Sequence, residues 1–215
     1  MQKVHNYAEK REQSKEDELI VGNWIASRPD TIWVRNVTED PEYWPREIDF
    51  VRYTIRQPKH GVSYEVKCCD VIHSTGRIFL EIIQNVWADP MWEGAWKVTE
   101  AKYWLYLDQV KRILYQFEVE PAKSWLRHKG LWREFTRDGR EQFYESRFRK
   151  EYPDGRIVDG MAHGICIPWP RMCAASATAV EAGGKPFFWI HKDWQEEILW
   201  DASRLVRAEK EGSLA

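Results

Sequence analysis

The clearest alternation of apolar and polar positions lies between Ile48 and Gln84. Three short runs rich in β-branched and aromatic residues occur there, separated by residues typical of turns, and such bounded runs predict strands. The expected strands are Ile48–Ile55, Val62–Cys68 and Ile78–Ile83, with turns at Gln57–Gly61 and Ser74–Gly76. We therefore expect three consecutive strands of one sheet in this part of the chain.

The remaining pattern predicts helices on both sides of this stretch and further strands after it. Helices are expected at Asn6–Ile25, Ala122–Lys129, Ala174–Val180 and Lys192–Glu209, the second opened by Pro121. Strands are expected at Thr31–Val37, Tyr103–Leu107 and Lys111–Phe117, and a short strand or coil at Pro186–Ile190. Asn85–Thr99 combines tryptophan with Asp, Pro and Gly, which favours a loop or lid.

Acidic residues occupy positions on the three central strands where a core strand is normally apolar. They are Asp49, Glu65 and Glu81, one on each strand. Because side chains alternate along a strand, Glu65 and Lys67 point to one face and Val66 points to the other. A cross-strand charge pair on a solvated face is the simplest interpretation of Glu65 and Lys67. A reaction centre is the alternative.

Two carboxylates on adjacent strands can share a hard divalent cation, since Mg²⁺ prefers oxygen ligands. Asp49 and Glu65 would supply the carboxylates, and the backbone carbonyl of Val66 would add a third ligand. Such an ion lowers the pKa of a bound water and neutralises charge that develops on a phosphate. Lys67 would position the attacking water or stabilise that charge. We expect Mg²⁺, with Mn²⁺ as a substitute.

The order of these residues resembles the PD-(D/E)xK nuclease superfamily, and within it the small phage and bacterial members. The landmarks are Asp49-Phe50, Glu65-Val66-Lys67, Thr75-Gly76 and Ile78-Phe79-Leu80-Glu81. One departure is that Ile48, rather than proline, precedes the aspartate. The resemblance implies an α/β fold with a restriction-endonuclease-like core, in which helices flank a central mixed sheet. It also implies phosphodiester hydrolysis, although members of a superfamily can keep the scaffold and lose catalysis.

The resemblance carries several further residues with it. In the family the first core helix often places a Glu near the metal. Glu18 is the best match, with Glu16 and Asp17 as competitors. Glu81 is a candidate for support of the site. Independently of the resemblance, His73 follows the Glu-x-Lys strand closely and could approach the site, and the alternative is an ordinary solvated loop histidine. The segment from Trp96 to Trp104 is similar to a family segment that continues as a helix over Val98–Trp104, but Glu100 and Lys102 replace its expected Lys and Asp. His163–Met172 is similar to the closing strand of the family domain.

The expected organisation is one nuclease-like domain over residues 1–180 and a helical C-terminal extension over residues 181–215, packed on it. A chain of 215 residues is long enough for one sizeable core. No second, sequence-reading domain is expected.

The charge of the whole chain does not indicate a nucleic-acid binder, but one segment is basic. The formal net charge of −2 gives no global signature of a nucleic-acid binder. Residues 121–156 are nevertheless basic, with 10 Lys and Arg against 6 Asp and Glu, and aromatic residues lie between them. This pattern fits contact with a phosphate backbone and equally fits an ordinary charged surface. The candidates for substrate contact are Trp92, Trp96, Lys97, Arg133 and Arg137.

The 13 tryptophans are interpreted mainly as core residues, although an exposed Trp92 or Trp96 could stack on an unpaired base. The four cysteines and six histidines show no metal-ligand spacing. No apolar run is long enough for a membrane span, and residues 1–18 contain no apolar signal core. These observations predict a cytoplasmic protein (the host cytoplasm if phage-encoded) without a membrane partner.

The function expected from the sequence is therefore Mg²⁺-dependent cleavage of DNA by Asp49, Glu65 and Lys67, with Glu18 as a fourth member and with structure-selective cleavage as an option. The alternatives are a catalytically inactive protein on the same scaffold that binds DNA or a protein partner, and a structural protein that binds neither metal nor DNA. A homodimer is compatible with all three.

Overall fold

The computed structural model describes residues 7–69, 72–88, 90–139, 142–151, 157–192, 194 and 205–207. The first half of the chain contains α1 (Tyr7–Ser27), β1 (Thr31–Asn36), the 3-10 turn η1 (Trp44–Arg46), β2 (Phe50–Thr54), β3 (Gln57–Cys69), α2 (Ile72–Thr75), β4 (Arg77–Asn85), β5 (Trp92–Glu93), α3 (Ala95–Val98) and β6 (Tyr103–Asp108). The second half contains β7 (Ile113–Glu118), α4 (Val119–His128), β8 (Tyr144–Glu151), β9 (Ile157–Pro168), α5 (Trp169–Glu181), β10 (Phe188–His191) and β11 (Leu205–Arg207).

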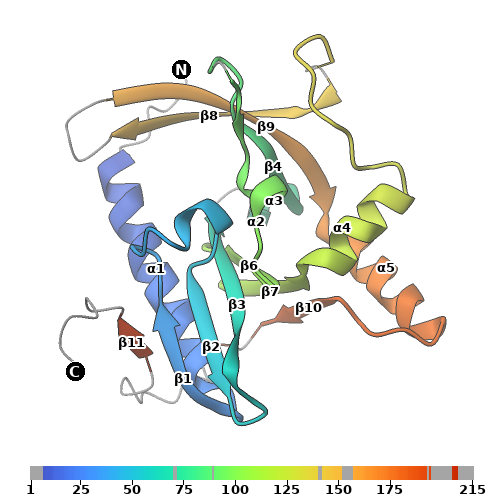
Figure 1. Cartoon of the computed structure of the whole chain (residues 1–215). Coiled ribbons are helices and arrows are strands. Elements are labelled where there is room, and N and C mark those ends of the chain that lie inside the picture. Colours follow the sequence, from blue (N-terminus) through green and yellow to red (C-terminus); the bar gives the residue numbers. More distant parts are fainter. Residues whose placement is uncertain are drawn as a thin grey trace.

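The larger sheet of the described residues has seven strands in the order β10-β7-β6-β3-β2-β1-β11. β1, β2 and β3 form an antiparallel meander, β6 runs parallel to β3, and β7 returns antiparallel to β6. The predicted mixed sheet with flanking helices is thus confirmed. Figure 1 shows α1 lying along β1 to β3.

The smaller sheet has four strands in the order β5-β4-β9-β8. Its strand β4 is the run that the sequence analysis placed beside β3, so that expectation was wrong. β4 pairs instead with β9, whose paired residues lie about 80 to 90 positions later in the chain (for example Ile78 with Ile167). The apolar alternation predicts a strand but does not specify which strand will pair with it.

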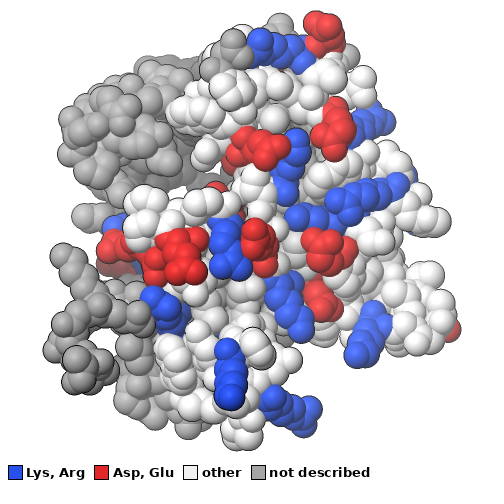
Figure 2. Space-filling view, in the orientation of Figure 1, with Lys and Arg blue, Asp and Glu red and all other residues white. Residues whose placement is uncertain are grey.

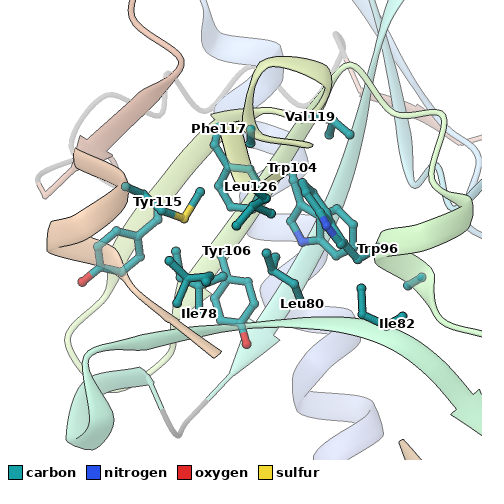
Figure 3. Close-up of a cluster of buried hydrophobic side chains, with 14 of the residues drawn as sticks. Ile78, Leu80, Ile82, Trp96, Trp104, Tyr106, Tyr115, Phe117, Val119 and Leu126 are labelled. Carbon is teal, nitrogen blue, oxygen red and sulfur yellow. The ribbon is translucent and has the colours of Figure 1, made fainter. Parts of the chain in front are cut away.

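Two apolar clusters hold these layers together. On one face of the larger sheet, Tyr64, Val66 and Leu105 pack against Val21 and Ile25 of α1. On the other face a larger cluster joins the two sheets and α4. It includes Ile78, Leu80, Ile82, Trp96, Trp104, Tyr106, Tyr115, Phe117, Val119 and Leu126. Figure 3 shows Trp96 and Trp104 lying together beside Leu80 in this cluster.

Three further boundaries differ from the sequence analysis. The expected turn Gln57–Gly61 lies inside β3, and the reversal occurs at Ile55 and Arg56 because Thr54 pairs directly with Gln57. The helix expected over Val98–Trp104 is limited to α3, which ends at Val98, and Tyr103 already belongs to β6. The strand expected over His163–Met172 ends at Pro168, where α5 begins.

The C-terminal segment also differs from the expected helical extension. β10 pairs with β7, and β11 pairs in parallel with β1, so this segment supplies both outer strands of the larger sheet. Within the expected helix Lys192–Glu209, the described residues Lys192, Trp194 and 205–207 are not helical, and the others lie outside the described residues. A short apolar stripe can serve a helix or a strand, and sheet edges with free hydrogen-bonding groups favour the strand here.

Candidate active site

Asp49 lies at the entry to β2, where the backbone is tied to β3. The Asp49 N–H donates to the Tyr64 carbonyl at 2.9 Å, and its Oδ2 accepts from the Val66 N–H at 2.7 Å. The N–H and C=O of a strand residue point to the same side, so the Val66 carbonyl also faces the Asp49 side of β3. The local sequence therefore places one carboxylate and one carbonyl together, as predicted.

Glu65 and Lys67 lie on the same face of β3, and this prediction is confirmed by direct contact. The Lys67 ammonium bonds Glu65 Oε1 and lies 3.3 Å from Glu47 Oε2. Glu65 is only 2% exposed, which contradicts the interpretation as a charge pair on a solvated face. Its Oε2 is buried and has no hydrogen-bond donor among the described residues. A buried oxygen of this kind is costly unless a donor or a cation compensates it.

Glu18 is the acidic residue of α1 that reaches this group. Its Oε1 accepts from the Ser14 hydroxyl at 3.3 Å, and its pKa responds to the charges of Lys67 and Glu65. The two competitors do other things. Asp17 is buried and bonds Arg112 and Gln109 at 2.7 Å each, whereas Glu16 is exposed. The choice of Glu18 among the three is therefore supported by its position.

Glu47 is a member of the cluster that the sequence analysis missed. Its backbone is left-handed, with φ of 48°, because it ends the 3-10 turn η1. Its carbonyl accepts from the Thr99 hydroxyl at 3.1 Å, which fixes the turn against α3. The sequence contained one indication of this role, because Glu47 precedes Asp49 by only two positions. The direction of its carboxylate toward Lys67, however, depends on the turn η1 and could not be predicted from the spacing.

Burial, and after it the charges of neighbouring carboxylates, raise the pKa of three carboxyl groups in this cluster, those of Asp49, Glu65 and Glu18. The pKa of Asp49 is raised from 3.8 to about 6, first by burial, with the Lys67 charge opposing and Glu18 adding to the rise. The pKa of Glu65 is raised well above its usual value by burial and then by Asp49. The pKa of Lys67 is raised well above its usual value because the effects of Glu65, Glu47 and Asp49 outweigh burial. Four carboxyl groups thus surround one ammonium, an arrangement that a further cation would stabilise.

The donor set fits a magnesium ion held by few protein ligands. Among the described residues, no three His, Cys, Asp or Glu side chains converge closely enough to hold a metal by themselves. The fit rests instead on Asp49, on the buried Oε2 of Glu65 and on the Val66 carbonyl. Mg²⁺ commonly keeps several waters and binds through only one or two carboxylates.

The residues predicted to touch substrate differ in their exposure and in their contacts within the protein. Trp96 is fully buried and packs on Trp104 at 4.9 Å, so its predicted stacking on a base is wrong. Trp92 is 40% exposed, because the two-residue strand β5 leaves it at the surface. Lys97 lies between the carboxylates of Glu93, at 2.7 Å, and Glu134, at 3.6 Å.

Three basic residues of the segment 121–156 are engaged with the protein itself. Arg133 donates to Gln142 at 2.6 Å, and Arg137 donates to the Ala88 carbonyl at 3.1 Å. Lys123 is buried, donates to the Thr99 carbonyl at 3.2 Å and has a pKa lowered by burial. Figure 2 shows acidic and basic side chains interspersed on the visible face.

Glu81 and His73, the predicted supporting residues, belong to other parts of the fold. Glu81 lies on β4 in the smaller sheet, and its Oε1 accepts from the Ala95 N–H at 3.3 Å, at the start of α3. His73 lies in α2, beyond the end of β3, and its carbonyl accepts from Lys111 at 3.1 Å. Both residues lie in the part of the chain between β3 and β6, His73 in α2 and Glu81 in β4.

No protein-family model, no curated protein and no solved structure matches this chain. Within the residues that the structure describes, no helix is both long and apolar enough to cross a membrane.

Proposed function

We propose that this protein is a metal-dependent DNA endonuclease of the PD-(D/E)xK type, with a restriction-endonuclease-like core. The observation that carries the proposal is the buried carboxyl cluster around Lys67, in which Glu65 Oε2 has no donor among the described residues. The topology supports it, because α1 precedes the meander β1-β2-β3 and β6 runs parallel to β3.

Each residue of the cluster would have a distinct role in phosphodiester hydrolysis. A bound Mg²⁺ supplies a Lewis acid and a water of lowered pKa. Asp49, oriented by the Val66 N–H, and Glu65 would hold the ion. Lys67 is kept charged by Glu65 and Glu47, so its ammonium would donate a hydrogen bond to the attacking water or to the phosphate oxygens. Glu18 would add negative charge next to the ion.

The second candidate is an inactive protein on the same scaffold that binds DNA or a protein partner. The exposed tryptophans favour it: Trp44, Trp87 and Trp92 are each at least 40% exposed. Base stacking on such rings contributes about 1–3 kcal/mol per base and needs no metal.

A cleavage assay separates the two candidates. Labelled single-stranded, duplex, flap and four-way-junction DNA would be incubated with Mg²⁺ or Mn²⁺. We expect metal-dependent cuts that disappear in Asp49→Ala and Lys67→Ala and persist in Lys59→Ala, which removes an exposed lysine from the far end of β3. Cuts of equal rate in all four proteins would exclude the catalytic role of the cluster. DNA binding without cleavage would favour the second candidate.

A further inference from the structure

The ammonium of Lys67 has a third neighbour besides its two carboxylates. It lies over the indole ring of Trp104, 5.7 Å from the ring centre. Trp104 belongs to β6 and is paired with Glu65 in the parallel register of β3 and β6. Paired residues of neighbouring strands point to the same face of a sheet, so the Trp104 ring stands beside Glu65 and Lys67. The indole therefore forms one wall of the place in which the ammonium lies.

An indole face attracts a cation, because the ring quadrupole is negative there. Tryptophan is the strongest of the aromatic residues in this respect, and the attraction acts within about 6 Å of the ring centre. The Lys67 side chain is 35% exposed, so its ammonium keeps access to solvent. Glu65, Glu47 and the Trp104 face together limit where that ammonium can lie.

The Trp104 ring is fixed by the core in which it is buried. It is 1% exposed and packs against Trp96, with ring centroids 4.9 Å apart. On the neighbouring strand β7, Phe117 stacks on it with centroids 6.2 Å apart and the planes inclined by 11°. Figure 3 shows these three rings within one apolar cluster. A ring packed in this way presents one fixed face to Lys67.

Burial in the core does not by itself account for an indole at this position. The Nε1 atoms of Trp104 and Trp96 are both buried and have no acceptor among the described residues. A buried donor without an acceptor costs free energy that a phenyl ring or an aliphatic side chain would not incur. Each of these two rings carries an ammonium on its face, Lys67 at 5.7 Å and Lys123 at 5.5 Å. Contact with a cation is therefore the property that distinguishes these indoles from ordinary core side chains.

We infer that Trp104 is a positioning residue of the proposed nuclease site, whose ring face holds the Lys67 ammonium in the direction of the attacking water or the phosphate oxygens. This role rests on the proposed function for what Lys67 does, whereas the contact between the two side chains does not depend on it. Trp104 would act only through Lys67, because its own ring is buried.

NMR of the full chain labelled with ¹³C at the lysine ε carbon tests the contact, because protons that lie over an aromatic face are shifted upfield. The Lys67 signal is the one that is missing in Lys67→Arg. We expect it upfield of the exposed Lys59 in the wild type, still upfield but less so in Trp104→Phe, and close to Lys59 in Trp104→Leu. Phe188→Leu removes a buried ring from the same cluster, two strands away from Trp104, and should leave the signal in place.

The consequence for catalysis is measured with the metal-dependent cleavage of DNA by the same proteins. Trp104→Leu should lower kcat about tenfold with little change in KM, because Lys67 would act mainly on the transition state. Trp104→Phe should retain most of the wild-type kcat, since a phenyl ring still offers an aromatic face. Phe188→Leu should retain all of it, although its stability falls.

A wild-type Lys67 signal at the position of Lys59, or one that keeps its full upfield shift in Trp104→Leu, would overturn the inference. Equal losses of kcat in Trp104→Leu and Phe188→Leu would also overturn it, because both changes would then act through the core alone. If Trp104→Leu does not fold, an unchanged Lys67 signal in Trp104→Phe contradicts the contact. Absence of cleavage by the wild type, together with an upfield Lys67 signal, would refute the proposed function and establish the contact.

Discussion

At the scale of single residues, the carboxyl cluster concentrates negative charge in a place where water is scarce. Asp49, Glu65 and Glu18 all have raised pKa values, and burial is the largest cause for each. Without a bound cation these groups hold protons more tightly than they would in the unfolded chain. The site is therefore a source of instability that protons relieve.

The first prediction concerns pH and Asp49. Its pKa is about 6 in the folded protein, against 3.8 for an aspartate exposed to water, so the folded state binds more protons between these values. The free energy of unfolding should accordingly fall as pH rises from about 4 to about 6, and the loss is complete above that range. Asp49→Asn should remove this part of the loss, which is at most about 3 kcal/mol at 1.36 kcal/mol per pKa unit.

Urea denaturation at pH 4, 5 and 7 in the presence of a chelator would measure how the free energy of unfolding depends on pH. Asp40→Asn serves as a control at an acidic residue outside the cluster. A steeper fall in Asp49→Asn than in the wild type would contradict the assigned direction. Mg²⁺ competes with protons for the same oxygens, so its affinity should increase as pH rises through about 6.

The second prediction concerns the pairing of Lys67 with Glu65. Lys67→Met leaves the buried Glu65 carboxylate without its cation, which should destabilise the protein at pH 8 by roughly 3 kcal/mol. The added change Glu65→Gln should restore much of that loss, because it removes the buried charge that Lys67 contacts directly, and of the pair Asp49 and Glu65 only Asp49 then remains charged. Thermal denaturation of the wild type, Lys67→Met, Glu65→Gln and the double variant gives a double-mutant cycle for this pair of side chains. Additive losses would show that the two side chains do not depend on each other.

At the scale of elements, the position of α1 on β2 decides whether Glu18 can reach the cluster. Gly22 allows this approach, since a Cβ at that position would lie 2.5 Å from the ring of the buried Phe50. Phe50 follows Asp49 directly, so displacement of its ring would also disturb the entry to β2. The helix and the strand therefore place Glu18 and Asp49 through one packing contact.

The third prediction tests that contact. Gly22→Val should lower the free energy of unfolding by about 1–3 kcal/mol through overpacking, despite the better helix propensity of valine. It should also weaken Mg²⁺ binding, because α1 moves away from Asp49. The neighbouring change Asn23→Ala, at a partly exposed position, serves as the control. Calorimetry with Mg²⁺ and urea denaturation measure the two effects. If the stability of Gly22→Val were unchanged, α1 and the Phe50 ring could move apart without loss of free energy, and the contact would not position Glu18.

At the scale of the whole molecule, the C-terminal segment completes the larger sheet at both edges. Phe188 pairs with Phe117 in the register of β10 and β7 and is buried. Trp194 is fully buried and donates to the Arg112 carbonyl at 2.7 Å. A segment with such contacts is part of the core.

The fourth prediction follows from this role. A chain that ends at Gly184 loses β10, β11 and Trp194, and we expect its free energy of unfolding to fall by roughly 3–5 kcal/mol or more. Hydrogen exchange should accelerate at β7 and β1, the strands that lose their neighbours. A matched shortening that ends at Arg207 should preserve both strands. Unchanged exchange at β7 and β1 in the chain that ends at Gly184 would show that the C-terminal segment does not stabilise the larger sheet.

The sequence was most informative where a local rule acts over a few residues. The period of two along β3 placed Glu65 and Lys67 on one face, and the preceding strand brought Asp49 beside them. The mixed sheet and the first helix followed from the same periodicities. These predictions succeeded because backbone geometry alone determines which side chains share a face.

Tertiary packing decided what the periodicities leave open. β4 pairs with β9 in a second sheet, Trp96 is buried between the two layers, and the C-terminal segment forms sheet edges. Each depends on a partner far away in the chain, which an apolar pattern does not name. By itself the sequence identified Asp49, Glu65, Lys67 and Glu18 and placed Glu65 and Lys67 on one face of β3. The burial of Glu65 and the contact of Glu47 with Lys67 arose only when distant segments excluded water from the same space.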